Sequence, residues 1–196
     1  KKLPEGTITF GKIKNEKIKS ICVFCGSSKN IGSEHRRITK KIGTLFAKKK
    51  IKVIFGGGRF GLCGDLADSV LEAKGEIVGI MPRFLEKLEL AHPRLTKLIL
   101  VKSLQERKEK MIESSDGFLI LPGGIGTMDE LLEVLTWKTL GLLNKPVVLL
   151  NSKNFWEPFL TTHSHLIKKK YSKSSTKTLY TAVKNPKLLL EKFGIF

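Results

Sequence analysis

The segment that most restricts the fold of this chain is an apolar run that ends in a glycine-rich loop. Residues 118–121 are too few for a helix but fit a strand that is buried on both faces. Pro122 ends the run, because proline has no N–H to donate to a sheet ladder. Three glycines follow and let the backbone turn sharply, and a helical pattern then runs to residue 140. The segment therefore predicts a strand, a loop and the N-terminus of a helix.

A strand, a glycine loop and a helix start in this order favour the binding of an anion. The first-turn N–H groups of the helix point toward the loop, and the positive end of the helix dipole faces a negative ligand. We expect Thr127 to cap this helix, with Asp129 and Glu130 in its first turn. The loop is thus predicted to hold a phosphate group.

Glu130 does not fit a simple phosphate site, because a bound phosphate repels a carboxylate. A carboxylate one turn into the helix would instead reach the sugar or a water beside the phosphate. This interpretation indicates chemistry on a phosphorylated sugar. The alternative is that Asp129 and Glu130 only favour the helix dipole, as acidic residues in a first turn often do.

The rest of the chain alternates between short apolar runs and helical patterns. This order predicts an α/β fold, a doubly wound parallel sheet of about seven strands with helices on both faces. Residues 1–17 are interpreted as a polar N-terminal extension, and residues 18–196 as one domain. The strands are expected near residues 18–25, 51–55, 77–81, 97–101, 118–121, 146–150 and 179–183.

A second glycine-rich loop, residues 56–64, follows the second strand. It matches G-x-G-x-x-G, but Glu76 opens the next strand, whereas a ribose-binding carboxylate belongs at that strand's far end. Pro82 and Arg83 occupy that end, which disfavours an NAD or FAD site. We expect this loop and the loop at Gly123 to meet at the carboxyl ends of the strands.

Composition and charge narrow the class of protein. No apolar run reaches the roughly 18 residues of a membrane helix, and the start lacks the apolar core of a signal peptide, so a cytoplasmic protein without a membrane partner is expected. The net charge of +18 invites a nucleic-acid interpretation, but only six of the 36 basic residues are arginines and the lysines are scattered. This pattern disfavours a nucleic-acid partner.

The three cysteines, Cys22, Cys25 and Cys63, predict neither a disulfide nor a metal site. Cys22 and Cys25 lie three apart in one strand, so their side chains are expected on opposite faces of the sheet. We predict buried, reduced thiols and no metal site.

Four segments of the chain resemble the "Lonely Guy" family of cytokinin-activating phosphoribohydrolases. They are Cys22-Val-Phe-Cys-Gly-Ser-Ser28, the glycine loop 56–64, Arg107-Lys108-x-x-Met111 and Pro122-Gly-Gly-Ile-Gly-Thr-Met-Asp-Glu130. The resemblance implies a Rossmann-like fold, no cofactor, and hydrolysis of the N-glycosidic bond of a nucleoside 5′-monophosphate, such as AMP or a cytokinin ribotide. The family's usual Met-His before the Arg-Lys pair reads Leu104-Gln105-Glu106 here.

The resemblance also implies which residues act. Arg107 and Glu130 correspond to the family's catalytic pair. The residues expected to bind substrate come from both glycine loops, from the Arg-Lys pair, and from a glutamate and a threonine that match family positions. They are Ser27, Gly57, Gly58, Glu89, Lys108, Gly123, Gly124, Ile125, Gly126, Thr127 and Thr136.

Two further expectations concern partners and rival functions. The helix from Thr127 to Leu140 is apolar on several sides, which predicts a homodimer interface, as the family's dimers imply. A non-catalytic carrier of a phosphorylated cofactor, similar to molybdenum-cofactor carriers, would use the same loops. The presence of Arg107 and Glu130 favours the hydrolase. A decarboxylase is disfavoured, because nothing distinguishes one lysine that could hold pyridoxal phosphate.

Overall fold

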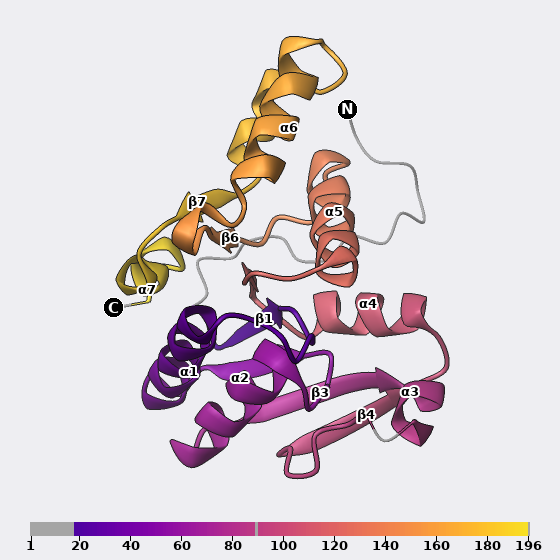
Figure 1. Ribbon diagram of the computed structural model, residues 1–196. Helices are drawn as coiled ribbons and strands as arrows, with labels where there is room; N and C mark the ends of the chain where they lie inside the picture. The colour runs from indigo at the N-terminus through magenta and orange to yellow at the C-terminus, as the bar shows by residue number, and fades with distance from the viewer. Residues whose placement is uncertain (1–17, 89, 196) are drawn as a thin grey trace.

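Seven parallel strands form one sheet between two layers of helices in the computed structural model, which describes residues 18–88 and 90–195 (Figure 1). The strands are β1 (Ser20–Phe24), β2 (Lys52–Phe55), β3 (Ile77–Pro82), β4 (Lys97–Val101), β5 (Gly117–Ile120), β6 (Val147–Leu150) and β7 (Thr181–Val183). The α-helices are α1 (Ser33–Lys48), α2 (Gly61–Glu72), α3 (Arg83–Lys87), α4 (Leu104–Glu113), α5 (Ile125–Thr139), α6 (Glu157–Lys168) and α7 (Leu189–Lys192). Three short 3₁₀ helices are η1 (Ser152–Asn154), η2 (Ser174–Thr178) and η3 (Pro186–Leu188).

The strand order β4-β3-β2-β1-β5-β6-β7 confirms the doubly wound sheet. The chain builds outward from β1 to β4, returns to place β5 beside β1, and then builds outward in the other direction. The pairing of β1 with β5 joins Ile21 to Gly117 and Phe24 to Ile120. Just beyond these strands, Gly26 donates its N–H to the carbonyl of Pro122 at 3.0 Å. This reversal of strand order is where ligands bind in open α/β sheets.

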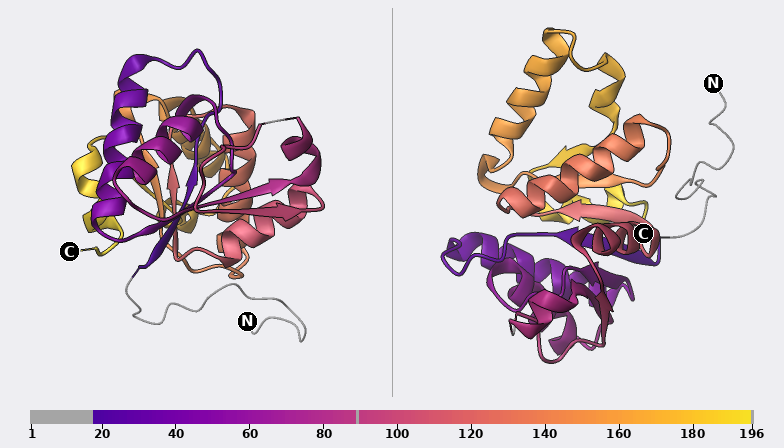
Figure 2. Two further views of the ribbon diagram at one scale, coloured as in Figure 1. Left: turned by 90° about the horizontal axis from the view of Figure 1, so that it is seen from below. Right: turned by 90° about the vertical axis from the view of Figure 1, so that its right-hand side faces the viewer.

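Alternating side chains of the buried strands fill two separate cores. On β1, Ile21 and Val23 face one core and Cys22 and Phe24 face the other. The first core is covered by α1, α2 and α7, and the second by α4, α5 and α6. The right-hand view of Figure 2 shows α1 and α2 on the opposite side of the strands from α5 and α6. The expected burial of β5 on both faces is confirmed, and β1 and β6 are buried in the same way. The edge strands β4 and β7, in contrast, are buried only at their last residue.

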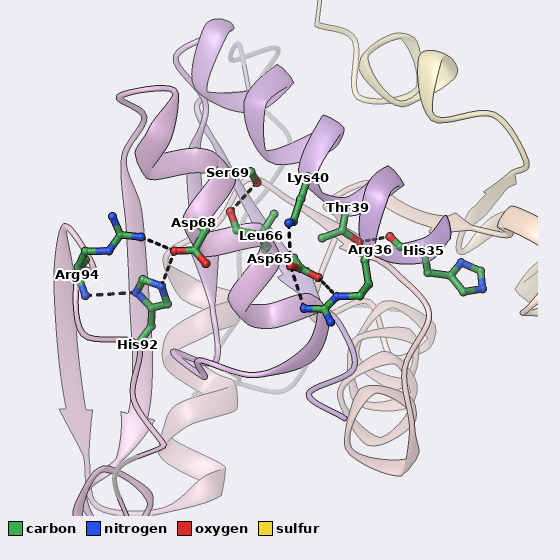
Figure 3. Close-up of polar contacts among 10 residues, drawn as sticks. All are labelled: His35, Arg36, Thr39, Lys40, Asp65, Leu66, Asp68, Ser69, His92 and Arg94. Carbon is green, nitrogen blue, oxygen red and sulfur yellow. Dashed lines mark hydrogen bonds and ion pairs between the residues drawn. The ribbon is translucent and has the colours of Figure 1, made fainter. Parts of the chain in front are cut away.

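Polar contacts fix α2 in the first helical layer (Figure 3). Arg36 of α1 donates to both carboxylate oxygens of Asp65, at 2.6 and 3.1 Å, and Asp65 is only 5% exposed. On the other side of α2, Asp68 contacts His92 and Arg94 in the connection between β3 and β4. These ion pairs hold the middle of α2 against two neighbouring elements.

Two sequence expectations, the N-terminal extension and the absence of a membrane helix, concern residues that the structure describes only in part. Residues 1–17 fall outside the described residues, so the boundary of the predicted extension stays a prediction. Within the described part of the chain, no helix has both the length and the apolar character needed to cross a membrane.

Candidate active site

A pocket of about 720 Å³ opens beyond the carboxyl ends of β1 and β5. Its walls come from the residues that follow β1, β2 and β5 and from the starts of α1, α2 and α5. The helix-capping residues Gly32, Phe60 and Gly124 all line it, and none of these three helix ends has a side-chain cap. Uncapped helix ends leave N–H groups for a ligand and direct three positive dipole ends toward the same space. The pocket therefore favours an anionic ligand.

The start of α5 differs from the one predicted from the sequence. The helix begins at Ile125 with Gly124 as its capping residue, so Thr127 is not the cap but the third helical residue. Thr127 is 4% exposed and its side chain lies beside Gly123, where any Cβ would collide with it. The loop between β5 and α5 therefore ends at Gly124. Glycine is a common residue at the capping position, although it has no side chain that could accept a hydrogen bond. Asp129 and Glu130 consequently lie in the second turn.

Arg107 of α4 and Glu130 of α5 meet at the inner wall of the pocket. Arg107 Nη2 donates to Glu130 Oε1 at 3.1 Å, and the two side chains are 19% and 12% exposed. Burial raises the pKa of Glu130 to about 7, while the positive charge of Arg107 opposes this shift. A carboxyl group that titrates near neutral pH can take up or release a proton during a reaction.

Arg107 keeps hydrogen-bonding capacity for a ligand. Within residues 18–88 and 90–195, its Nε–H is buried without a hydrogen-bond partner, and its contact with Glu130 uses one terminal nitrogen. Gly56 allows the guanidinium to lie there, because any Cβ at this position would overlap the Arg107 side chain. A buried donor without a partner is costly, so an acceptor on a bound ligand would stabilise this arrangement.

The pocket brings most of the predicted site residues together. Besides Arg107 and Glu130, the predicted residues that line it are Ser27, Gly58, Gly123, Gly124, Ile125, Gly126 and Thr127. Gly57 is buried behind the loop with φ +82°, and its carbonyl accepts from His92 N–H. Glu89 lies outside the described residues.

Two predicted substrate contacts lie away from the pocket wall. Lys108 turns to the other side of α4, with its Nζ 2.6 Å from Glu133 and 3.1 Å from Asp129. Burial acts to lower the pKa of Lys108, but the contacts that its ammonium makes with these two carboxylates outweigh burial and raise the pKa above its ordinary value. Thr136 is exposed on α5 and donates to the carbonyl of Leu132.

Several pocket residues were not expected from the sequence. Arg59 and Phe60 follow the triple glycine, and His35 and Phe155 make an edge-to-face contact at 5.8 Å between ring centroids. Lys29 Nζ lies 4.3 Å from the centre of the Phe60 ring. Phe60 was visible within the glycine motif, but Phe155 comes from the distant segment before α6 and carries no motif. In the described part of the chain, no group of three or more His, Cys, Asp or Glu side chains is placed to hold a metal ion.

The chain matches a family and several relatives over most of its length. The family described as "Possible lysine decarboxylase" matches residues 63–193. A cytokinin riboside 5′-monophosphate phosphoribohydrolase of Rhodococcoides fascians is 41% identical over 148 residues, which cover 75% of each chain. The enzyme of the same name, LOG5, of Arabidopsis thaliana is 34% identical over 94% of this chain and 81% of its own length.

Solved structures share the fold. An X-ray structure of a Northeast Structural Genomics Consortium target is 27% identical, with a TM-score of 0.68 over 88% of this chain and 96% of that chain. The molybdenum cofactor binding protein of Rippkaea orientalis has a TM-score of 0.67 over 91% of this chain and 96% of that chain; at 19% identity it shows the fold alone. From the family match and the relatives above 30% identity, the chain belongs to the family of cytokinin riboside 5′-monophosphate phosphoribohydrolases, whose family description is possible lysine decarboxylase.

Proposed function

We propose that this protein hydrolyses the N-glycosidic bond of nucleoside 5′-monophosphates and releases the free base and ribose 5-phosphate. The observation that carries the proposal is the buried Arg107–Glu130 pair in a pocket that also receives the uncapped start of α5. The names of the Rhodococcoides and Arabidopsis relatives support the same reaction. Cytokinin ribotides and AMP are the substrates proposed for this chain.

The spacing along α5 suits a nucleotide. A 5′-phosphate on the N–H groups of Ile125, Gly126 and Thr127 would sit at the positive end of the helix. Glu130 follows Ile125 by five positions, which is roughly 7.5 Å along a helix with a rise of about 1.5 Å per residue. Helical side chains tilt toward the N-terminus, so the Glu130 carboxylate leans back toward the phosphate site. The sugar of a nucleotide anchored by its phosphate would therefore lie beside this carboxylate.

The proposed reaction uses Glu130 as its acidic group. Loss of a base from ribose develops positive charge on the sugar, and an ionised carboxylate stabilises that charge or removes a proton from the attacking water. Water adds to the anomeric carbon as the bond to the base nitrogen breaks, and the base leaves with a proton. Arg107 holds Glu130 with one nitrogen and offers its buried Nε–H to the substrate.

A panel of nucleoside 5′-monophosphates tests the proposal directly. Purified protein is incubated with AMP, a prenylated adenosine monophosphate, GMP and CMP, and the release of ribose 5-phosphate and free base is measured. Glu130→Gln, which keeps the shape of the side chain, serves as the control. Release of base by the normal protein and not by the variant supports the proposal. A pocket that binds nucleotides without releasing base from any of them would favour the carrier alternative.

The homodimer through α5 is also a proposal. Exposed apolar side chains lie along this helix and near it, with Leu132 48%, Leu140 58% and Leu104 of α4 51% exposed. Burying such side chains between two subunits would stabilise a symmetric dimer. Thr136 lies on the same helix, so a substrate contact from Thr136 requires that the interface bring it to the partner's pocket. Sedimentation of the normal protein and of Leu132→Asp distinguishes a dimer from a monomer.

A further inference from the structure

Two of the three cysteines meet at the wall of the pocket. Cys25 directly follows β1 and Cys63 lies in the first turn of α2, and their sulfur atoms are 3.2 Å apart. Both residues line the pocket and both are 9% exposed. Cys22 is fully buried on the opposite face of β1 and belongs to the other core. The proposed hydrolysis uses neither thiol of the pair, so their contact is left without a role.

The two segments that carry the pair are already fixed against each other. Leu62 donates its N–H to the carbonyl of Gly26 at 2.9 Å. Gly61 has φ +59°, and a Cβ there would overlap the backbone of Ser27 and Ser28, so no gap separates the two segments. The sulfur atoms are about 1.2 Å farther apart than the bonded distance of a disulfide, a difference that side-chain rotation can close.

We propose that Cys25 and Cys63 form a reversible disulfide when the protein meets hydrogen peroxide, and that a ligand in the pocket protects them. In the first step, the Cys63 thiol is oxidised by peroxide to a sulfenic acid, with release of one water. In the second step, the sulfur of Cys25 attacks the sulfur of Cys63, and the hydroxyl group leaves with the proton of Cys25 as a second water. One peroxide is reduced and two thiols are oxidised to one disulfide.

The roles of the two sulfurs follow from their surroundings. Cys63 lies in the first turn of α2, at the positive end of the helix dipole, and is assigned as the sulfur that peroxide oxidises first. The hydrogen bond to Cys63 and burial raise the pKa of Cys25, so Cys25 is the less reactive sulfur toward peroxide. It attacks only after the neighbouring sulfenic acid has formed, and it gives up its proton in that step. Peroxide is small enough to enter the pocket, whereas a bound sugar phosphate would cover the exposed parts of both sulfurs.

Peptide mapping tests the disulfide without any measurement of hydrolysis. Trypsin places Cys25 in the peptide 20–29 and Cys63 in the peptide 60–74. The protein is treated with peroxide, and the remaining free thiols are blocked before digestion. We expect the two peptides to be linked, with a mass lower by two hydrogens than the sum of the separate peptides. Dithiothreitol should then restore the two separate peptides. Because Cys22 shares the first peptide, Cys22→Ala is the matched control and should still give the linked pair. Two separate peptides with blocked thiols would overturn the proposal.

Single variants test the order of the steps. In Cys25→Ala, the sulfenic acid on Cys63 has no neighbour to attack it and should be trapped by dimedone. In Cys63→Ala, trapping at Cys25 should be at least roughly tenfold lower, because the more reactive sulfur is gone. The reverse pattern would overturn the assigned roles. Circular dichroism of both variants establishes that the fold is retained.

Protection by a ligand completes the test, and this part rests on the proposed function. Ribose 5-phosphate is used because it is a product and is not hydrolysed. If calorimetry shows that it binds, a saturating concentration should slow disulfide formation by at least about tenfold. Binding without protection would overturn the link between the thiols and the pocket. Absence of binding would count against the proposed function, while the disulfide itself would still be decided by the peptide map.

Discussion

Two ion pairs join α4 to α5, and they differ in whether they face the pocket and keep a donor available to a ligand. Arg107 and Glu130 face the pocket, where one nitrogen of the arginine contacts the carboxylate and its Nε–H has no partner within the described residues. Lys108 lies between Glu133 and Asp129 and contacts both. Both pairs are largely buried, with side chains of Arg107, Glu130, Lys108 and Glu133 between 12% and 19% exposed. Burial alone therefore does not distinguish the pair that faces the pocket.

The comparison teaches that neighbouring residues of one sequence motif can have different roles. Arg107 and Lys108 are adjacent, but a helix turns by about 100° per residue, so they face different directions. The pocket pair retains a donor and a carboxyl group that titrates near neutral pH, as a reaction requires. In the outer pair, Lys108 hydrogen-bonds to Asp129 and lies 2.6 Å from Glu133 Oε2, an ion pair without hydrogen-bond geometry. Its charges are thus paired with each other, and the pair holds α4 against α5. Four predictions separate these roles.

The largest effect is expected from Glu130→Gln. The amide cannot act as a base or stabilise positive charge on the sugar, so kcat should fall by about 10²- to 10⁴-fold with little change in KM. Steady-state kinetics of ribose 5-phosphate release measure this. Glu133→Gln, one turn further along α5, is the matched control and should retain most of the activity. Equal losses in both variants would remove the distinction between the two pairs.

The pH dependence of stability should also reveal Glu130. Its pKa is raised from 4.5 to about 7 in the folded protein, so the folded state binds the proton more tightly than the unfolded chain. This contribution is present at acidic pH and is lost as the pH rises through about 7, by on the order of 3 kcal/mol. The free energies of unfolding of the wild-type protein and of Glu130→Gln, measured in urea, should therefore change differently between about pH 4 and pH 8. Relative to the wild-type protein, the variant should gain stability toward the alkaline end. Parallel stability curves would contradict the raised pKa.

A smaller loss is expected from Arg107→Lys. Lysine keeps the positive charge but lacks the planar set of donors, so it cannot hold Glu130 and offer a second N–H to substrate in the same geometry. We expect kcat/KM to fall by roughly 10- to 100-fold while thermal stability stays similar. Activity close to normal would mean that only the charge of Arg107 matters.

The smallest effect on turnover is expected from Lys108→Met, which breaks the outer pair. Glu133 then keeps a buried charge without its partner, and the protein should lose about 1–3 kcal/mol of stability. Denaturant unfolding of Lys108→Met, Glu133→Gln and the double variant gives the coupling between the two residues. Turnover should fall far less than in Arg107→Lys. A large rise in KM without loss of stability would instead support the substrate contact that the sequence predicts for Lys108.

The sequence predicts the architecture well because the pattern of the strands is repeated along the chain. Short apolar runs followed by helical spacing gave the parallel sheet, and the glycine loops gave its ligand-binding edge. The start of α5 was placed wrongly, because threonine is a frequent cap and the capping role of Gly124 leaves no sequence signal. Thr127 is instead buried beneath Gly123.

The parts of the site that the sequence could not predict depend on contacts between distant segments. Phe155 reaches the pocket from beyond β6, and no local pattern marks it. The direction of Lys108 depends on how α4 packs against α5, which spacing within α4 does not determine. Cys25 and Cys63 were predicted as buried thiols, and both are buried and free, but their contact requires the position of α2 beside β1.

The pairing of β1 with β5 also governs when the pocket can form during folding. At the start of these strands, the Asp116 carboxylate accepts hydrogen bonds from the N–H and hydroxyl of Ser20, 96 positions earlier. A chain emerging from the ribosome can assemble β1 to β4 early, but it holds an unfinished edge at β1 until β5 arrives. Contacts of such long range slow folding and leave an intermediate exposed to aggregation. Chaperone dependence and expression yield should therefore be sensitive to Asp116, although this residue is remote from the chemistry.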